Sequence, residues 1–410
     1  MRRILFVIGT RPEAIKMAPV IRCALGHRDL QVSVCSTGQH KEMLQPVLSF
    51  FDIPVHFELD VIQHLPDLNG LFARIIQTFA DVLSAFGPDR VLVHGDTTSA
   101  AACALASFNR RVPVGHVEAG LRTRDLSKPF PEEFNRQMID LIADHFYAPT
   151  EATRRNLLEE RKPAQRVYVT GNTVVDALLM ACAILDRNPG LISRLESKFA
   201  YLDPSMPLVL VTAHRRESFG QGFKNICSAL RDLARTGFME IIYPVHLNPN
   251  VREPVMRDLS DLRSVHLIDP VSYPEFIYLM RRATIILTDS GGIQEEAPSL
   301  GKPVLVMRDV TERPEAVEIG IVRLVGTDPL RIVSAVESYL NSRGANVAQE
   351  LDVNPYGDGH ASERIVQILE QESPDSPTEA PSLDGLFVDH SIAPSRRTVD
   401  ENSELSQSAA

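Results

Sequence analysis

Acidic residues in the first half of the chain stand where a proton could be added to or removed from a substrate. Asp96 and Glu118 each end a short apolar run, whereas Glu132 opens a predicted helix. That helix starts at Pro131, and it places Glu132 and Arg136 one turn apart on one face. A single acid at a strand end is as well explained as a helix cap. Three acids at one edge favour general acid–base catalysis.

The second half of the chain carries residue types that bind anions. "HRRE" begins with His214 and Arg215, directly after an apolar run. "DSGG" (289–292) lies between a predicted strand and a helix predicted over "IQEEAPSLG", where glycines let a ligand approach backbone N–H groups. A hydrolase elbow needs G-x-S-x-G, whereas Ser290 precedes both glycines. We therefore interpret this turn as a cradle for an anion and not as the position of a nucleophile.

Acids in one half and anion binders in the other suit one kind of reaction. Arg11 and Lys16, which follow the first apolar run, are predicted to reach toward the ligand of the second half. Arginine forks match phosphate oxygens. The pattern indicates an anionic leaving group beside a carbon atom that exchanges a proton.

Two other kinds of site are disfavoured. No G-x-G-x-x-G follows a predicted strand and no Walker sequence occurs, so the usual nicotinamide and nucleoside-triphosphate fingerprints are missing. A metal site is less favoured because four histidines lie at four different strand ends without an H-x-x-x-H pair. These histidines are His94, His116, His214 and His246.

Short apolar runs alternate with longer segments of helical spacing, which indicates βαβ units and a parallel sheet. The first series comprises 4–8, 31–37, 90–96, 112–118 and 166–171. After a polar, helical stretch at about 172–205, a second series comprises 207–213, 240–245, 264–269, 283–289, 303–307 and 321–326. The predicted class is α/β, with two Rossmann-like doubly wound units. Ligands bind beyond the carboxyl ends of such strands, where the polar motifs fall.

Composition sets further limits. The 410 residues are 44% hydrophobic and 23% charged, which is ordinary for a globular protein of two or three domains. More than half of the net charge of −11 lies after residue 370, and the acidic balance argues against a nucleic-acid partner. No apolar run approaches a membrane span or a signal peptide, and the five scattered cysteines suit free thiols in a reducing cytoplasm. The Ser-, Pro- and acid-rich segment 373–410 is predicted to be disordered, with 383–388 as a candidate docking patch.

From residue 1 to about 371 the chain resembles the non-hydrolysing UDP-N-acetylglucosamine 2-epimerases. The motifs that carry the resemblance are "GTRPEAIKMAPVI", "TGQHKEML", "VHGDTT", "GHVEAGLRT", "PFPEEFNR", "VTAHRRE", "PVHLNPNV", "DSGGIQEEAPSLGKPVLV", "TERPEA" and "NPYGDGHASERI". The family implies two Rossmann-like domains in the arrangement of the GT-B glycosyltransferases, with the active site in the interdomain cleft. It also implies domains at 1–171 and 172–358, UDP held mainly by the second, and a C-terminal helix (about 359–371) that returns to the first.

The reaction implied by the family is reversible inversion at C2 between UDP-GlcNAc and UDP-ManNAc, without a cofactor or a metal. It proceeds by anti elimination of UDP to a 2-acetamidoglucal and re-addition of UDP. The resemblance also implies a cytoplasmic homodimer that supplies ManNAc units for surface polysaccharides, with no nucleic-acid or membrane partner.

The family match also implies roles for individual residues. The proton-transfer acids are Asp96, Glu118 and Glu132, without a choice of which acid serves which face of C2, and Lys16 and His214 match further active-site positions. Residues matched to substrate and UDP binding are Arg11, Arg136, Arg215, Phe276 at the uracil, Ser290, Gly291 and Gly292 at the phosphates, Glu296 at the ribose, and Arg313.

Some positions depart from the family. Ser218 replaces a common Asn in "HRRES". Some bacterial relatives bind a second UDP-GlcNAc as an activator, and Gln39, Arg215 and His246 match that site. Glu42 and "PDLNG" (66–70) match it poorly.

Three alternatives stay open. A hydrolysing epimerase would release ManNAc and UDP, although "HVEAGLRT" and "PFPEE" follow the non-hydrolysing form. A GT-B transferase would need the UDP half but not the acids. A UDP-sugar sensor would need no acids beside C2.

Overall fold

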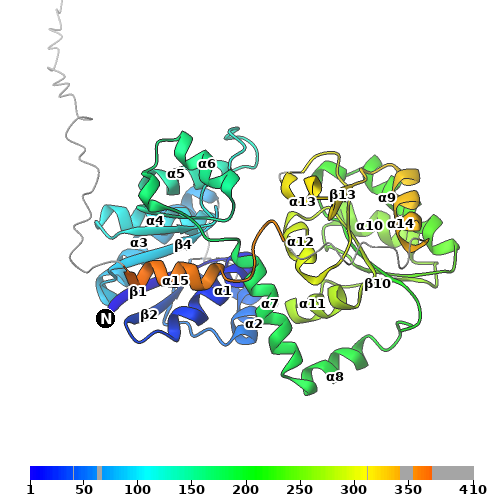
Figure 1. The fold of residues 1–410 in the computed structure, drawn as a ribbon, viewed down its shortest axis with the longest axis horizontal. Helices are drawn as coiled ribbons and strands as arrows, with labels where there is room; N and C mark the ends of the chain where they lie inside the picture. The colour runs from blue at the N-terminus through cyan, green and yellow to red at the C-terminus, as the bar shows by residue number, and fades with distance from the viewer. Residues whose placement is uncertain (40, 62–66, 312, 342–353, 372–410) are drawn as a thin grey trace, which may run out of the picture. The chain divides into compact units, whose positions relative to one another are not determined.

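The structure is a computed structural model that describes residues 1–39, 41–61, 67–311, 313–341 and 354–371. It contains two parallel sheets, one in each half of the chain (Figure 1). The tail predicted to be disordered (373–410), its segment 383–388 and Pro66 of the "PDLNG" loop lie outside the described residues.

The first sheet has the strand order β3-β2-β1-β4-β5-β6-β7. This order is typical of Rossmann folds, extended by one strand. Its strands are β1 (Arg2–Ile8), β2 (Leu30–Ser36), β3 (Phe57–Glu58), β4 (Arg90–His94), β5 (Val114–Val117), β6 (His145–Ala148) and β7 (Val167–Val169).

The second sheet repeats the same winding, with the order β10-β9-β8-β11-β12-β13. Its strands are β8 (Leu208–Thr212), β9 (Glu240–Pro244), β10 (Val265–Ile268), β11 (Ile285–Thr288), β12 (Val304–Val306) and β13 (Val322–Leu324). In each sheet, the side on which successive strands are added changes once. The change lies between β1 and β4 in the first sheet and between β8 and β11 in the second. Ligands of doubly wound sheets bind at these reversals, beyond the carboxyl ends of the strands.

Helices connect the strands of both sheets. They are α1 (Arg11–Leu25), α2 (Lys41–Phe51), α3 (Leu68–Phe86), α4 (Thr98–Asn109), α5 (Glu132–Ile142), α6 (Glu151–Glu159), α7 (Thr173–Asp186), α8 (Pro189–Lys198), α9 (Gln221–Arg235), α10 (Pro249–Leu259), α11 (Tyr273–Arg282), α12 (Gly291–Glu296), α13 (Pro314–Glu318), α14 (Pro329–Asn341) and α15 (Ala361–Gln371). Three short 3₁₀ turns add η1 (Ala164–Arg166), η2 (Arg216–Ser218) and η3 (Ala297–Leu300).

Alternation along β1 explains why helices cover both faces of the first sheet. Ile4, Phe6 and Ile8 belong to one core cluster, which includes the apolar face of α1. Leu5 and Val7 belong to another, together with residues of α3 and α4. Successive side chains of a strand point to opposite faces, so a run that is apolar throughout must be covered on both.

The structure corrects three sequence predictions. Strands β3 and β6 were not predicted, because β3 has two residues and β6 is a four-residue segment that starts with a histidine. The stretch at 172–205 is helical but not polar throughout, since α7 is largely buried. The helix predicted over "IQEEAPSLG" is the six-residue α12, followed by η3, in which a proline interrupts the α-helical pattern.

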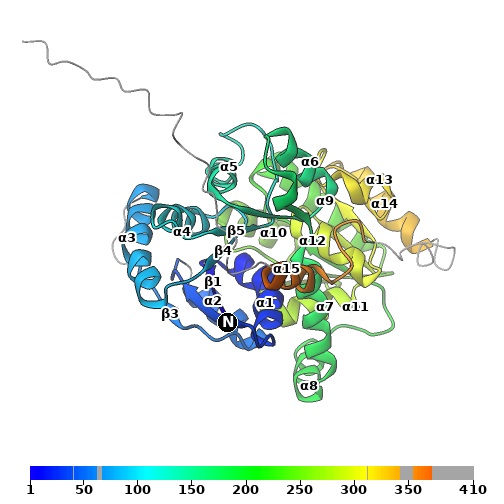
Figure 2. The same ribbon diagram turned by 60° about the vertical axis from the view of Figure 1, so that its left-hand side comes forward.

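The C-terminal helix α15 lies beside α1, far from it in sequence (Figures 1 and 2). Arg2 donates a hydrogen bond to the carbonyl oxygen of Leu369, and the His27 ring contacts the Glu370 carboxylate. At the start of α15, Asp176 of α7 accepts the backbone N–H of Ser362 at 2.7 Å. The domain limits at 171 and 358 stay a prediction.

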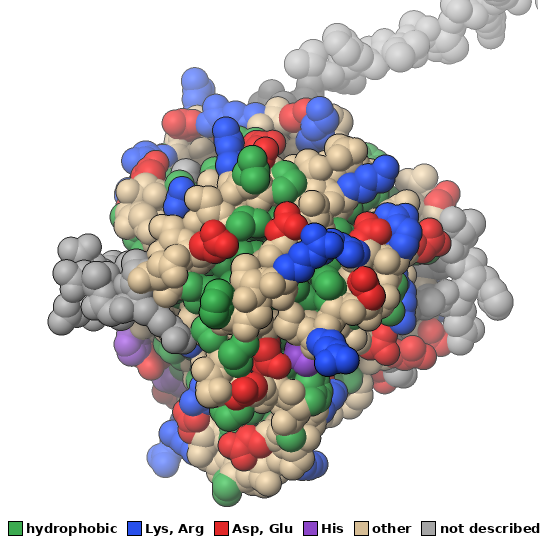
Figure 3. Space-filling view, turned by 90° about the vertical axis from the view of Figure 1, so that its right-hand side faces the viewer, with side chains coloured by type: hydrophobic (Ala, Val, Ile, Leu, Met, Phe, Trp, Pro, Cys, Tyr) green, Lys and Arg blue, Asp and Glu red, His purple; other side chains and the backbone are tan. Residues whose placement is uncertain are grey.

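In the described ranges no helix combines the length and apolarity needed to cross a bilayer. On the face drawn in Figure 3, acidic and basic side chains are interspersed.

Candidate active site

The turn after β1 is tied to the turn after β4 by a buried carboxylate. Glu13 accepts the backbone N–H groups of Gly9 at 3.0 Å and Thr10 at 2.7 Å, and it accepts the Thr97 hydroxyl at 2.6 Å. Burial raises the pKa of Glu13. Sequence reasoning did not single out Glu13, although Thr10 and Glu13 form a capping box. This carboxylate fixes the loop that carries Arg11.

Glu118 follows β5 in a left-handed backbone conformation, with φ of 67°. Its carboxylate contacts the Lys16 ammonium and lies 3.4 Å from Nε2 of the buried His94. Burial opposes the charge of Glu118, but Lys16 and His94 outweigh it, so its pKa lies well below the ordinary value. Burial likewise opposes the charge of Lys16, and Glu118 and Glu295 together raise its pKa. Glu118 is therefore held as a carboxylate.

Asp96 lies two residues beyond β4 and is held by α5. Arg136 donates to Asp96 Oδ2 at 2.6 Å, and Asn135 Nδ2 donates to the Asp96 carbonyl at 2.9 Å. Glu132 occupies the first turn of α5, as predicted, and is half-buried. In the described part of the chain its side chain has no hydrogen bond, so it is available to a ligand.

Glu133, the neighbour of Glu132, has a structural position. It is fully buried and accepts the backbone N–H groups of Thr123 at 3.0 Å and Arg124 at 2.9 Å. These bonds fasten the loop that follows Glu118 to the start of α5. Two adjacent acids in "PFPEE" thus have different environments, which the sequence did not distinguish.

A buried histidine–aspartate pair contacts the backbone next to both strand-end acids. His116 Nδ1 is 2.6 Å from Asp140 Oδ1, and its Nε2 is 2.7 Å from the Gly95 carbonyl oxygen. Asp140 Oδ2 also accepts from the backbone of Gly120 at 3.2 Å and from Arg122 at 2.7 Å. Asp140 therefore braces the residues next to Asp96 and Glu118. Sequence reasoning missed it, because it lies inside a helix.

In the second sheet one aspartate joins the two anion-binding motifs. Asp289, the first residue of "DSGG", is fully buried and accepts the backbone N–H groups of His214 and Arg215, each at 2.7 Å. His214 Nδ1 lies 3.4 Å from Asp289 Oδ1, and the ring stacks on His246 with centroids 5.6 Å apart. Burial, then Arg215 and His246, lower the pKa of His214 against the opposing effect of Asp289.

The "DSGG" turn is open at its second glycine. A Cβ at Gly292 would meet nothing within 4 Å, whereas a Cβ at Gly291 would clash with the Arg313 guanidinium. Ser290 is the N-cap residue of α12, and its own N–H donates to Thr288 Oγ1 at 2.9 Å. A ligand can therefore approach the backbone at Gly292, beside the Arg313 guanidinium.

Charged residues from the two sheets meet around Lys16. Its ammonium lies 3.8 Å from Glu295 Oε2 while it contacts Glu118. Arg11 donates to the Val271 carbonyl at 3.5 Å. Burial is the main cause that lowers the pKa of Arg11, against the opposing influence of Tyr273 and Glu296.

Glu296 is a buried carboxyl group with an unusual proton affinity. The Tyr273 hydroxyl donates to its Oε1 at 3.3 Å. Burial, with a smaller effect of Glu295, raises the pKa of Glu296 from 4.5 to about 7. Phe276, on the same helix as Tyr273, is half-buried and packs against the core.

The residues matched to a second, activating ligand do not contact one another across the two halves of the chain, among the residues that the structure describes. Gln39 Oε1 accepts from Ser99 at 2.7 Å in the first sheet. His246 is exposed beside His214 in the second. No hydrogen bond or ring contact between described residues joins Gln39 to Arg215 or His246.

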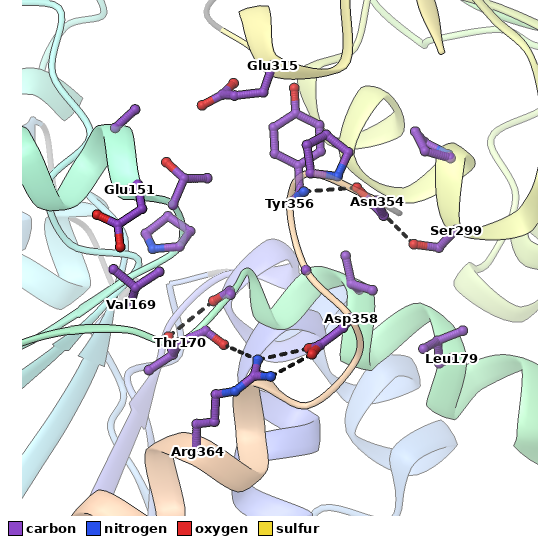
Figure 4. A pocket seen from close by; sticks show the side chains of 18 of the residues that line it. Glu151, Val169, Thr170, Leu179, Ser299, Glu315, Asn354, Tyr356, Asp358 and Arg364 are labelled. Carbon is purple, nitrogen blue, oxygen red and sulfur yellow. Dashed lines mark hydrogen bonds and ion pairs between the residues drawn. The ribbon is translucent and has the colours of Figure 1, made fainter. Parts of the chain in front are cut away.

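A cavity of about 1090 Å³ lies elsewhere (Figure 4). Its lining includes Glu151, Leu179, Glu315 and Asp358, and it contains none of the predicted site residues. We therefore place the chemistry at the strand ends and not in this cavity.

Comparisons with known proteins agree with this geometry. The family model described as UDP-N-acetylglucosamine 2-epimerase matches residues 24–370. A UDP-N-acetylglucosamine 2-epimerase of Escherichia coli K12 is 52% identical over 368 residues, covering 90% of this chain and 98% of that protein.

Two solved structures are similar over 90% of this chain and 100% of theirs. The Neisseria meningitidis UDP-GlcNAc 2-epimerase bound to UDP-GlcNAc is 46% identical, with a TM-score of 0.83. The Methanocaldococcus jannaschii UDP-GlcNAc 2-epimerase in complex with UDP-GlcNAc and UDP is 33% identical, with a TM-score of 0.75.

Fold and site together define an α/β enzyme of the nucleotide-sugar class, with two Rossmann-like sheets in a GT-B-like arrangement. The chain belongs to the UDP-N-acetylglucosamine 2-epimerase family. The predicted fold class and family are confirmed.

Proposed function

We propose that this protein is a non-hydrolysing epimerase that interconverts UDP-GlcNAc and UDP-ManNAc in the cleft between domains 1–171 and 172–358. The observation that carries the proposal is the meeting of two kinds of residue around Lys16. This residue contacts the acid Glu118 and lies 3.8 Å from Glu295, four residues beyond the Gly291 of the cradle. The ligands named for the related structures, UDP-GlcNAc and UDP, support the choice of substrate.

The proposed reaction has two balanced steps. A carboxylate removes the C2 proton while the C1–oxygen bond breaks, and UDP leaves with the bonding electrons to give a 2-acetamidoglucal. UDP oxygen then re-adds to C1, and C2 takes a proton on its opposite face. General acid–base groups contribute about 10²–10⁴-fold each. Both faces of C2 need such a group, and three acids are candidates: Asp96, Glu118 and Glu132.

Geometry suggests how these acids differ. Lys16 holds Glu118 as a carboxylate, which suits a group that accepts a proton, and Arg136 donates a hydrogen bond to Asp96. Glu132 has no such partner among the described residues, so its carboxyl group is available to the substrate.

The leaving group needs a separate set of contacts. We assign its phosphates to Arg11, Arg215, Arg313, His214 and the turn Ser290–Gly292, its ribose to Glu296 and its uracil to the neighbourhood of Phe276. Held in this way, UDP stays bound while it is detached from the sugar. Arg136 is assigned to substrate binding through Asp96.

We further propose a cytoplasmic homodimer whose product supplies ManNAc units for surface polysaccharides. A transferase reading is less favoured, because an acceptor reaction does not use three acids beside C2.

Incubation of the protein with UDP-GlcNAc in D₂O, followed by NMR, tests the proposal. We expect UDP-ManNAc with deuterium at C2. Free ManNAc without UDP-ManNAc would replace the proposal with the hydrolysing reaction. Tight UDP binding without turnover would indicate a sensor.

A further inference from the structure

Glu295 is a buried charge that the proposed mechanism does not use. It lies on α12, one residue before Glu296, and is 5% exposed. Its Oε1 accepts from Arg313 Nε at 2.6 Å, and its Oε2 lies 3.8 Å from Lys16 Nζ. Oε2 has no hydrogen-bond partner in the described part of the structure. One carboxylate therefore faces two cations that come from different halves of the chain.

The backbone on both sides of the Glu295–Arg313 pair is fixed independently of the pair itself. Asn354 Nδ2 donates to the Glu295 carbonyl at 3.0 Å and to Ser299 Oγ at 2.6 Å. The Tyr356 hydroxyl donates to the Arg313 carbonyl at 3.0 Å. Figure 4 shows Asn354 and Tyr356 on the same loop segment, with the Asn354 side chain directed at Ser299. A change of the Glu295 side chain should therefore move side chains and leave the loops in place.

Each of the two cations that face Glu295 also lies next to another residue of the site. Arg313 lies against Gly291, next to the open Gly292. Lys16 contacts Glu118, the acid that follows β5. A carboxylate that attracts both cations sets where each of them stands, because opposite charges a few ångströms apart in a buried site attract strongly.

We propose that Glu295 is a positioning residue that holds Arg313 at the phosphate cradle and Lys16 beside Glu118. The inference rests on the proposed function, since it requires that the cradle receives UDP.

The Glu295 charge also influences the neighbouring Glu296, which gives the positioning role a second readout. Burial is the main reason why the pKa of Glu296 is about 7, and the neighbouring Glu295 raises it further. The other groups that face Glu296 are Lys16 and Arg11 of α1, which lower its pKa, and the Tyr273 hydroxyl of α11, which donates to it. Removal of the Glu295 charge should therefore lower the pKa of Glu296.

Two variants separate the reach of Glu295 from its charge. Glu295→Gln keeps the shape and removes the charge, whereas Glu295→Asp keeps the charge and withdraws it from Arg313. Glu315→Gln is the matched control. Glu315 also belongs to the second half of the chain and borders the cavity of Figure 4, but it has no hydrogen bond or ion pair to the site residues among the described positions.

The measurement is UDP affinity by calorimetry between about pH 5.5 and 8.5, with turnover of UDP-GlcNAc at each pH. We expect Glu295→Gln to weaken UDP binding on the order of 10-fold, as for one charge-assisted hydrogen bond. The pH at the midpoint of the change in UDP affinity should also be lower in this variant than in the wild type. Glu295→Asp should weaken binding without moving the midpoint, and Glu315→Gln should change neither.

Failures of the two proposals can be told apart. Wild-type protein that neither binds UDP nor converts UDP-GlcNAc would overturn the proposed function. Normal wild-type behaviour with a Glu295→Gln variant that matches Glu315→Gln would overturn this inference alone. If thermal melts show that Glu295→Gln does not fold, Glu295→Asp decides: unchanged UDP affinity in that variant would also overturn the positioning role.

Discussion

The two sheets share one winding but prepare their strand ends in different ways. In the first sheet, Asp96 and Glu118 already have cationic partners from the same half of the chain. In the second, the His214 side chain is 42% exposed and Gly292 is open. The first sheet fixes charges for proton transfer before any ligand arrives. In the second, Asp289 fixes the backbone at His214 and Arg215, and the turn at Gly292 stays open to a ligand.

Two buried aspartates, one in each half of the chain, support the strand ends of the two sheets in different ways. Asp140 braces the turns next to Asp96 and Glu118 through His116 and a backbone N–H. Asp289 accepts the N–H groups that begin "HRRE" and continues into the cradle. Each aspartate connects two strand ends, so a loop prediction that treats each motif separately misses both. The comparison predicts that changes around the acids of the first sheet alter turnover, and that changes around "HRRE" and "DSGG" alter UDP affinity.

The largest expected effect comes from Asp96→Asn. The variant keeps the shape of the side chain but cannot take up a proton, so turnover of UDP-GlcNAc should fall by about 10²–10⁴-fold. UDP affinity, measured by calorimetry, should stay near the wild-type value. Near-normal turnover would remove Asp96 from the chemistry and break the division between the sheets.

Two matched variants, Asp140→Asn in the first half and Asp289→Asn in the second, test more directly whether the two sheets have different roles. Loss of a charged acceptor weakens the bonds that hold each turn, by roughly 1.5–3 kcal/mol per bond. Asp140→Asn should lower kcat with UDP affinity retained, and Asp289→Asn should lower UDP affinity by roughly ten- to a hundredfold. Steady-state kinetics with calorimetry measures both, and thermal melts check the fold. The same effect of both variants on both quantities would contradict the comparison.

Ser290→Ala sharpens the account of the cradle. The Ser290 N–H is occupied by Thr288, so only the hydroxyl is available to a phosphate. Its removal should weaken UDP binding on the order of 10-fold, as for one hydrogen bond to a charged group. Calorimetry measures the loss, with Ser197→Ala, at an exposed serine of α8, as a control outside the cradle. Abolished turnover with unchanged affinity would mean that the serine takes part in the chemistry.

The smallest expected effect is a pH dependence of UDP binding. The pKa of Glu296 is about 7, so the carboxyl group is protonated below that pH and ionised above it. An ionised carboxylate accepts hydroxyl donors better than a protonated one. UDP affinity should therefore rise a few-fold as the pH increases through about 7. Calorimetry on Glu296→Gln removes this contribution and leaves the titration of UDP itself, so an identical profile in the variant would exclude the ribose role.

Stability without ligand should follow the opposite direction. A carboxyl group whose pKa is raised from 4.5 to about 7 binds more protons in the folded state between those values. This group therefore contributes less to stability as the pH rises from 4.5 to 7, and its contribution is constant above.

Much of the fold was predictable from the sequence. The eleven predicted strands occur, and β4 and β5 end next to the acids that were expected there. Glu132 lies at the start of α5, as the proline before it indicated. The missed strand β3 has only two residues, too few for a periodic signal, and β6 ("HFYA") begins with a histidine and lacks the aliphatic run of the other strands.

Residues that act through burial were not predictable. Glu13, Asp140, Asp289 and Glu295 look like ordinary acids in the sequence. Their importance lies in partners far along the chain, such as Thr97 for Glu13, and no local pattern encodes such a partner. The difference between Glu132 and Glu133 has the same origin, since Glu133 is buried against the loop of Thr123 and Arg124 and Glu132 is half-buried without a hydrogen bond among the described residues.

The sequence by itself determined the family, the two-sheet winding and the residue types at the strand ends, because apolar periodicity and motif order are local properties of the chain. Only the tertiary structure decided which charges meet. Lys16 stands between Glu118 and Glu295, which are 177 residues apart in the sequence, and Asp289 joins "DSGG" to "HRRE". Packing brings these groups together, and burial then makes each contact strong by removing the water that would screen it.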